Sequence, residues 1–221
     1  MLTCRPYPGQ AMSTSRTLTL RTRLIRLVVS WVLVGVGVPM LVRAELGVAP
    51  FDVLNSGLNR TLGWSFGNCF IVSSVLFFAL GWALGARLGW ASPVGTFVIG
   101  PIVNLVLDRI GHHEALAVRV PLLLGGIAVI ATAICLVVST DLGPGPSEMF
   151  MLGLIHRGMP ILPARWLSDG SPVVVGLVLG GALGVGTALF AAVMGPLVRF
   201  GLRHLGYVPR TLATSAKPTA G

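Results

Sequence analysis

The sequence has few charged residues. Only 10% of its 221 residues are Asp, Glu, Lys or Arg, and only seven are acidic. An average soluble domain is about 25% charged, so a chain of this length with so few ionic groups does not cover a water-exposed surface. The sequence also lacks a Walker A motif, a Gly-x-Ser-x-Gly motif and a His-Glu-x-x-His motif. We therefore expect no nucleotide hydrolysis and no other enzymatic activity from this chain.

Cysteine and histidine offer no metal or redox site. The spacing of the three cysteines, Cys4, Cys69 and Cys135, matches no metal-binding or redox pattern. His112, His113 and Glu114 follow the third predicted span; adjacent histidines point in different directions on a helix, and no ligands beyond these three are in sight. We expect neither a metal nor another cofactor.

Long apolar runs dominate the chain instead. Hydrophobic residues make up 54% of the sequence, and the mean hydropathy is +0.86. Because lipid cannot satisfy free backbone groups, apolar runs long enough to cross about 30 Å of hydrocarbon should be α-helices. The sequence therefore predicts an all-α membrane protein with about six transmembrane helices. The predicted spans are Leu24–Val42, Phe66–Ala86, Pro93–Ile110, Val120–Ser139, Arg165–Leu183 and Ala188–Leu205.

Basic residues indicate the orientation of these spans. The 16 Lys and Arg residues exceed the seven acidic ones, but they are dispersed between apolar runs, which argues against nucleic-acid binding. With the N-terminus in the cytoplasm, the outer segments hold only Arg43, Arg60, Arg109 and Arg119. Cytoplasmic segments of membrane proteins are enriched in Lys and Arg. We therefore expect a multi-pass protein of the cell membrane with both termini in the cytoplasm.

The sequence repeats itself. The segment 45–52 (ELGVAPFD) recurs as 141–148 (DLGPGPSE), 96 positions later. Further on, Leu84-Gly85 and Gly100-Pro101 recur 95 positions later as Leu179-Gly180 and Gly195-Pro196. Self-similarity at a fixed offset indicates an internal duplication.

Each copy of the repeat contains three predicted spans. Three is an odd number, so the second copy must enter the membrane upside down, as in many secondary transporters. We expect two inverted three-helix repeats with a short half-helix in each. The predicted parts are a basic N-terminal segment (1–23), the first repeat (24–111), an outer linker (112–119), the second repeat (120–206) and a cytoplasmic tail (207–221).

The repeated motifs resemble those of a known family. The paired Leu-Gly-x-x-Pro segments, each with an acidic residue two positions after the proline, and the later Gly-Pro resemble the YczE/YitT group of bacterial integral membrane proteins. The Pro-Trp-Asp of that group stands here as Pro50-Phe51-Asp52. The resemblance implies a small multi-pass protein of the cell membrane without an assigned biochemical activity.

Four of the seven acidic residues lie in the repeated motifs. Glu45 and Asp52, like Asp141 and Glu148, are separated by seven positions, which is two helical turns. The proline in each motif suits the first turn of a short helix, where a carboxylate also interacts favourably with the helix dipole. Two interpretations stay open: these acids cap interfacial helices in water, or they line a solute path.

A second charged group begins the fifth predicted span. Arg165 and Asp169 have the i, i+4 spacing of an intrahelical ion pair, whereas their counterparts in the first copy, Phe70 and Ser74, are uncharged. Ionisable residues at membrane depth are candidates for function. The structural alternative is an ion pair that lets the arginine reach the interface.

The remaining polar and small residues suggest packing. Asn68 and Asn104 lie in apolar runs and are expected to bond between helices. Gly81, Gly85 and Gly89 recur at every fourth position, as do their counterparts in the second copy, which predicts a flat stripe for close helix contact.

The sequence-based hypothesis for function has two forms. The first is a small-solute carrier or solute-binding membrane component, with Asp52 and Glu148 binding solute or protons and Arg165, Asp169, Glu45 and Asp141 in support. The second is a non-transporting scaffold or accessory subunit. The expected partners are the lipid bilayer and, in the first form, a small molecule; assembly with a second copy or with another membrane subunit stays open.

Overall fold

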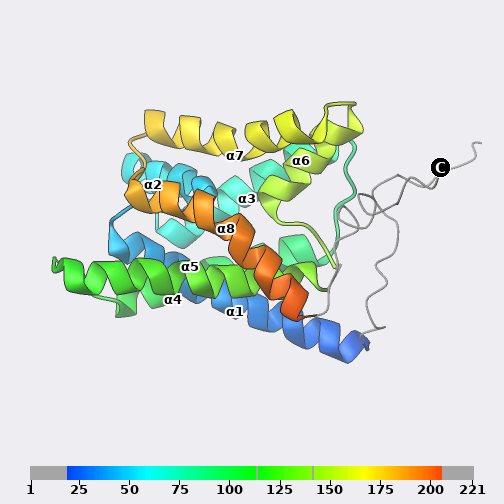
Figure 1. The fold of residues 1–221 in the computed structure, drawn as a ribbon. Coiled ribbons are helices and arrows are strands. Elements are labelled where there is room, and N and C mark those ends of the chain that lie inside the picture. Colours follow the sequence, from blue (N-terminus) through cyan, green and yellow to red (C-terminus); the bar gives the residue numbers. More distant parts are fainter. Residues whose placement is uncertain (1–18, 113, 141, 206–221) are drawn as a thin grey trace, which may run out of the picture.

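The described part of the protein consists of eight α-helices and contains no β-strand (Figure 1). The structure is a computed structural model that describes residues 19–112, 114–140 and 142–205. Most of the predicted segment 1–23 and all of the predicted tail 207–221 therefore lie outside the described residues. The helices are α1 (Leu20–Ala44), α2 (Pro50–Leu62), α3 (Phe66–Ala83), α4 (Ala91–Arg109), α5 (Leu116–Val138), α6 (Pro146–His156), α7 (Ile161–Val178) and α8 (Val185–His204).

Five of these helices are long and apolar enough to cross a membrane: α1, α3, α4, α5 and α8. Helix α7 has 18 residues but is not among them, because it contains Arg165 and Asp169 together with several small and polar residues. Helices α2 and α6 have 13 and 11 residues, about 20 and 17 Å at 1.5 Å per residue, which is too short to cross.

The two short helices begin where the sequence predicts them. Pro50 and Pro146 each occupy the first helical position, where a missing N–H costs no hydrogen bond. Helix α2 ends at Gly63, whose φ of +68° requires the left-handed conformation that glycine adopts without strain. The local signals of proline and glycine thus set the bounds of α2.

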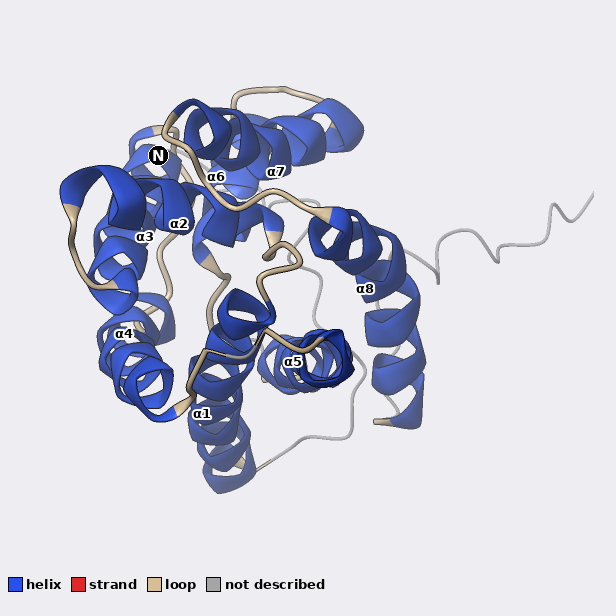
Figure 2. Cartoon of the chain, turned by 90° about the vertical axis from the view of Figure 1, so that its left-hand side faces the viewer, coloured by secondary structure: helices blue, strands red, loops and turns tan. Residues whose placement is uncertain are grey.

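The packing pairs helices from the first and second half of the chain. Helix α1 packs along α5, and Figure 2 shows α4 and α8 on opposite sides of this pair. Helix α2 packs against α7, and α6 packs against α3. The pairs α1–α4 and α2–α3 have the counterparts α5–α8 and α6–α7. Each of these contacts has an equivalent when the two halves are exchanged.

Close contacts between glycines are also equivalent in the two halves. A Cβ atom at Gly57 would lie 2.7 Å from the carbonyl oxygen of Gly176. A Cβ atom at Gly153, which is 96 positions after Gly57, would lie 2.8 Å from the carbonyl oxygen of Gly81. Both contacts join a short helix to a long helix of the other half, and both leave no room for a side chain.

The predicted glycine stripe is wrong beyond its first members. Gly81 and Gly176 lie inside α3 and α7, but these helices end at Ala83 and Val178. Gly85 and Gly180 therefore lie in the following turns, with φ values of +98° and +78°. Glycines at every fourth position form a stripe only within a continuous helix. Here their spacing predicted a helix at residues where the chain turns.

One contact has no equivalent. Helix α3 packs against α4, where the carbonyl oxygen of the Asn104 side chain accepts a hydrogen bond from the backbone N–H of Gly67 at 2.8 Å. The expected bond between helices is thereby confirmed for Asn104, whereas the side chain of Asn68 is exposed and makes no such bond within the described residues. In the second half, α7 and α8 do not form such a packed pair within the described residues.

Candidate functional site

A cavity of about 700 Å³ lies between the two halves of the chain. Its walls come from the long helices α1, α3, α4, α5, α7 and α8, and from the N-terminal ends of α2 and α6. Most of the side chains that line it are apolar. The charged residues that line it are Asp52, Glu148, Arg165 and Asp169. Four of the six predicted site residues therefore lie around one cavity.

Asp52 is the most deeply buried of these four residues. It is the third residue of α2 and is only 4% exposed. Its Oδ1 accepts a hydrogen bond from Nδ2 of Asn55 at 2.9 Å, and Oδ1 of Asn55 accepts one from the hydroxyl of Ser73 on α3. No basic residue of the described chain pairs with Asp52. Because an unpaired buried charge costs free energy, this site favours a bound proton or a positively charged ligand.

Glu148 occupies the equivalent position in α6 but has a different environment. It is half-buried, and its Oε2 accepts a hydrogen bond from the backbone N–H of Gly145 at 3.2 Å. Glu148 therefore caps its helix and lines the cavity at the same time. The two interpretations of the acidic motifs do not exclude each other at this residue, whereas Asp52 has no such capping bond.

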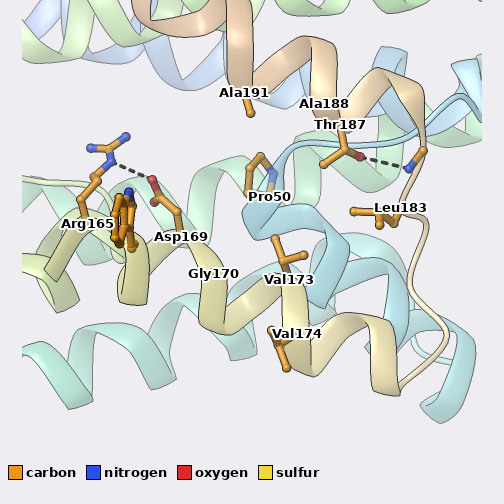
Figure 3. A pocket seen from close by; sticks show the side chains of 12 residues that line it. Pro50, Arg165, Asp169, Gly170, Val173, Val174, Leu183, Thr187, Ala188 and Ala191 are labelled. Atoms are coloured by element: carbon orange, nitrogen blue, oxygen red, sulfur yellow. Dashed lines mark hydrogen bonds and ion pairs between the residues drawn. The ribbon is translucent and has the colours of Figure 1, made fainter. Parts of the chain in front are cut away.

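Arg165 and Asp169 form the ion pair that their spacing predicts. The Nε of Arg165 donates to Oδ2 of Asp169 at 2.7 Å, and the two side chains are 54% and 38% exposed. The pair lies where the cavity meets a side opening of about 530 Å³ between α7 and α8. Figure 3 shows this side opening, with Pro50 between the side chains of α7 and those of α8.

The side opening is lined by residues of α7 between Arg165 and Val174, by the turn residues Leu183 and Gly184, and by residues of α8 between Thr187 and Ala191. It shares four lining residues with the central cavity: Pro50, Arg165, Asp169 and Ala191. The two spaces therefore lie next to each other, on either side of these residues.

Glu45 lies apart from the cavity. It caps the end of α1 with a φ of 50°, is exposed, and pairs with His112 at 3.0 Å and with Arg119 at 3.7 Å. Only Asp52 of the first acidic pair lines the cavity, because α1 ends at Ala44 and the chain turns before α2 begins. Asp141 lies outside the described residues.

Sequence reasoning missed the polar and aromatic neighbours of Asp52. Asn55 has the i, i+3 spacing that places it beside Asp52 on one helix face, and this signal was available. Ser73 gave no such signal, because it reaches Asn55 from α3. The aromatic side chains that line the cavity come from four helices and show no common sequence pattern: Trp31, Phe51, Phe70, Phe78 and Phe190.

The fold and the cavity define a multi-helix membrane protein, and comparison with known proteins agrees. The chain belongs to the family of unknown function DUF6198, whose model matches residues 21–203. It is 30% identical over 183 residues to an uncharacterized protein of Haemophilus influenzae, covering 80% of this chain and 82% of the relative. It is 25% identical over 205 residues to the uncharacterized membrane protein YczE of Bacillus subtilis, covering 85% of this chain and 91% of YczE. The predicted resemblance to YczE is thus confirmed, and no solved structure matches the chain.

Proposed function

We propose that the protein is a six-span membrane protein of two inverted halves that binds a small solute in its central cavity and carries it across the membrane. The observation that carries this proposal is the cavity itself, which gathers Asp52 and Glu148 from equivalent positions of the two halves. Sites at the interface of two repeats, next to the ends of short helices, are typical of secondary transporters.

The exchange of helix contacts supports the inverted arrangement. Contacts α2–α7 and α6–α3 are equivalent under the 95- to 96-residue repeat, as are the glycine contacts within them. Under this proposal α7 also crosses the membrane, as the fifth of six spans in chain order; it is equivalent to α3 and about 27 Å long at 1.5 Å per residue. An even number of spans is consistent with both termini in the cytoplasm.

Asp52 is the proposed proton-binding group. Its carboxylate is buried beside an amide and a hydroxyl rather than a basic residue, so the neutral acid avoids the cost of a buried charge. Binding of solute and of a proton to one cavity couples their movements when one half shifts against the other. Glu148, half-buried and bonded to Gly145, is the second proposed binding group.

The test is proton movement in proteoliposomes that contain a trapped pH indicator. A panel of amines, amino acids and organic acids is applied outside, and a compound that moves with protons shifts the internal pH. We expect at least one compound to do so with the natural protein and not with Asp52→Asn or Glu148→Gln. Asp108→Asn is the control, because Asp108 is exposed at the end of α4 and lies outside the cavity.

Two results contradict the carrier proposal. One is a pH shift that stays unchanged in both cavity variants. The other is the absence of any shift across the panel, which favours the scaffold or accessory-subunit hypothesis.

A further inference from the structure

The charges around the cavity are unbalanced. Its described lining contains three carboxylates and one guanidinium. The guanidinium of Arg165 already pairs with Asp169 at 2.7 Å. Asp52 and Glu148 have no basic partner among the described residues, and the Oδ2 atom of Asp52 has no hydrogen-bond partner there. The cavity is therefore complementary to a positively charged group.

The uncharged walls indicate what kind of cation fits. Five aromatic side chains line the cavity, among them Trp31 of α1 and Phe190 of α8. The faces of aromatic rings attract cations, and this attraction strengthens when water is excluded. A small hydrated ion gains little from apolar walls, whereas an organic cation with an apolar body contacts both the rings and the carboxylates. A volume of about 700 Å³ is in the usual range of organic ligand sites, about 300–1,000 Å³.

The ends of α2 and α6 do not reverse this preference. A helix N-terminus carries about half a positive charge and by itself favours an anion. Here Asp52 and Glu148 occupy the third position of their helices, so each N-terminus is offset by a full negative charge. Glu148 in addition accepts the N–H of Gly145, which removes one of the donors that an anion would use.

The side opening shows how such a molecule reaches the cavity. On its rim, Trp166 and Val174 are 69% and 62% exposed, and the nearby Val185 is 82% exposed. Side chains of this kind face hydrocarbon in a membrane-spanning bundle. The opening therefore faces the lipid, and the Arg165–Asp169 pair, which lines both spaces, stands between it and the cavity; Figure 3 shows this pair beside the opening.

We infer that the cavity binds an apolar organic cation that enters it from the bilayer through the side opening between α7 and α8. This inference rests on the proposed function, since it names the substrate class of the same cavity. The Arg165–Asp169 pair, which is net neutral, lets a cation pass where an unpaired arginine would repel it.

Binding of tetraphenylphosphonium and tetraphenylborate tests the charge preference. These two ions have nearly the same size and shape and opposite charge. Equilibrium dialysis against the purified full chain, with protein-free micelles as the blank, measures saturable binding of each. We expect tetraphenylphosphonium to bind at least tenfold more tightly than tetraphenylborate. Equal or tighter binding of tetraphenylborate, or saturable binding of neither ion, overturns the inference.

Variants then locate the bound ion. We expect the double variant Asp52→Asn with Glu148→Gln to weaken tetraphenylphosphonium binding at least tenfold, and Asp108→Asn to leave it unchanged. Because Asp52 is buried, Glu148→Gln alone is the second variant, with at least a threefold loss expected. Undiminished binding in these variants overturns the inference. Tighter binding of tetraphenylborate that still depends on the cavity residues overturns the cation class alone, and the carrier proposal is then judged by the proteoliposome panel.

The route is tested by narrowing the side opening. A Cβ atom at Gly170 has no neighbour within 4 Å, and Gly170 lines the opening, so the side chain of Gly170→Phe begins in open space there. We expect it to slow tetraphenylphosphonium association severalfold in nanodiscs, while Val178→Phe, at an 83% exposed position outside the opening, has no effect. An unchanged rate with Gly170→Phe overturns lateral access. Efficient cross-linking of two chains through Gly170→Cys in membranes also overturns it, because a second copy then covers the opening.

Discussion

The α3–α4 pair and the α7–α8 pair stand in the same order in the two halves, yet the first pair is closed and the second is open. In the first, Gly100 packs against Gly67 and Ile71, and Asn104 bonds to the backbone of Gly67. In the second, a Cβ atom at Gly195 would have no neighbour within 4 Å. The same Gly-Pro sequence, Gly100-Pro101 and Gly195-Pro196, thus serves close packing in one half and borders the cavity in the other.

The distribution of charged residues agrees with this difference between the two helix pairs. Phe70 and Ser74 of α3 are 7% and 0% exposed, whereas the equivalent Arg165 and Asp169 of α7 are 54% and 38% exposed at the side-chain level. A closed interface tolerates no unpaired charge, because burial removes the water that stabilises it. An open one leaves room for an ion pair at little cost. The charged pair in one copy and not the other therefore marks the half that opens.

The first prediction concerns the opposite orientation of the halves. In a Cys4→Ser background, Leu62→Cys and Gly158→Cys place single reactive thiols at equivalent exposed positions, at the last residue of α2 and just after α6. We expect a membrane-impermeant maleimide applied to intact cells to label Leu62→Cys and not Gly158→Cys, because inverted repeats put these ends on opposite faces. Labelling of both variants, or of neither until the cells are lysed, contradicts the inverted arrangement.

The second prediction moves a charge from the open pair to the closed one. Ser74→Asp buries a carboxylate at a fully buried position and should lower the free energy of unfolding by several kcal/mol, seen as loss of membrane accumulation. The reciprocal Asp169→Ser removes one partner of a partly exposed pair and should change stability by only about 0–1 kcal/mol. Comparable destabilisation by the two changes would show that α3–α4 is no more closed than α7–α8.

The third prediction concerns the contacts that the two halves share. Gly57→Ala and Gly153→Ala each force a methyl group against a backbone oxygen of the other half. We expect both to lower stability by about 1–3 kcal/mol, since overpacking between backbones is not relieved by side-chain movement. Thermal unfolding in detergent measures both. A loss in only one of them breaks the equivalence of α2–α7 and α6–α3.

The fourth and smallest effect separates the two Gly-Pro sequences. A methyl group in Gly100→Ala would lie 2.6 Å from the Ile71 side chain and 2.9 Å from the backbone oxygen of Gly67, so we expect a loss of about 1 kcal/mol or more. Gly195→Ala meets no atom and replaces a helical glycine, so we expect a gain of up to about 1 kcal/mol. The melting temperatures of the two variants in the same detergent test this prediction. Shifts of the same sign in both variants would contradict the different packing of the two Gly-Pro sequences.

Local sequence signals predicted much of the architecture. The six predicted segments coincide with long helices to within a few residues, and five of these helices are apolar enough to cross a membrane; Pro50 and Pro146 correctly begin the two short ones. These features depend on hydropathy and on the backbone geometry of proline, which act over a few neighbouring residues. Gly85 was misplaced because a fourfold spacing does not reveal where a helix stops.

By itself, the sequence determined that this is a helical membrane protein with a duplicated pattern, because too few charges remain to cover a soluble surface and the motifs recur at a constant offset. It also determined the Arg165–Asp169 pair, which one helix brings together. Only the tertiary structure decided that Asp52 and Glu148 face one cavity while Glu45 turns away to His112 and Arg119. The opening between α7 and α8 also became visible only in the tertiary structure. A gap between helices depends on how segments distant in the sequence pack, and no local sequence pattern predicts that two helices do not touch.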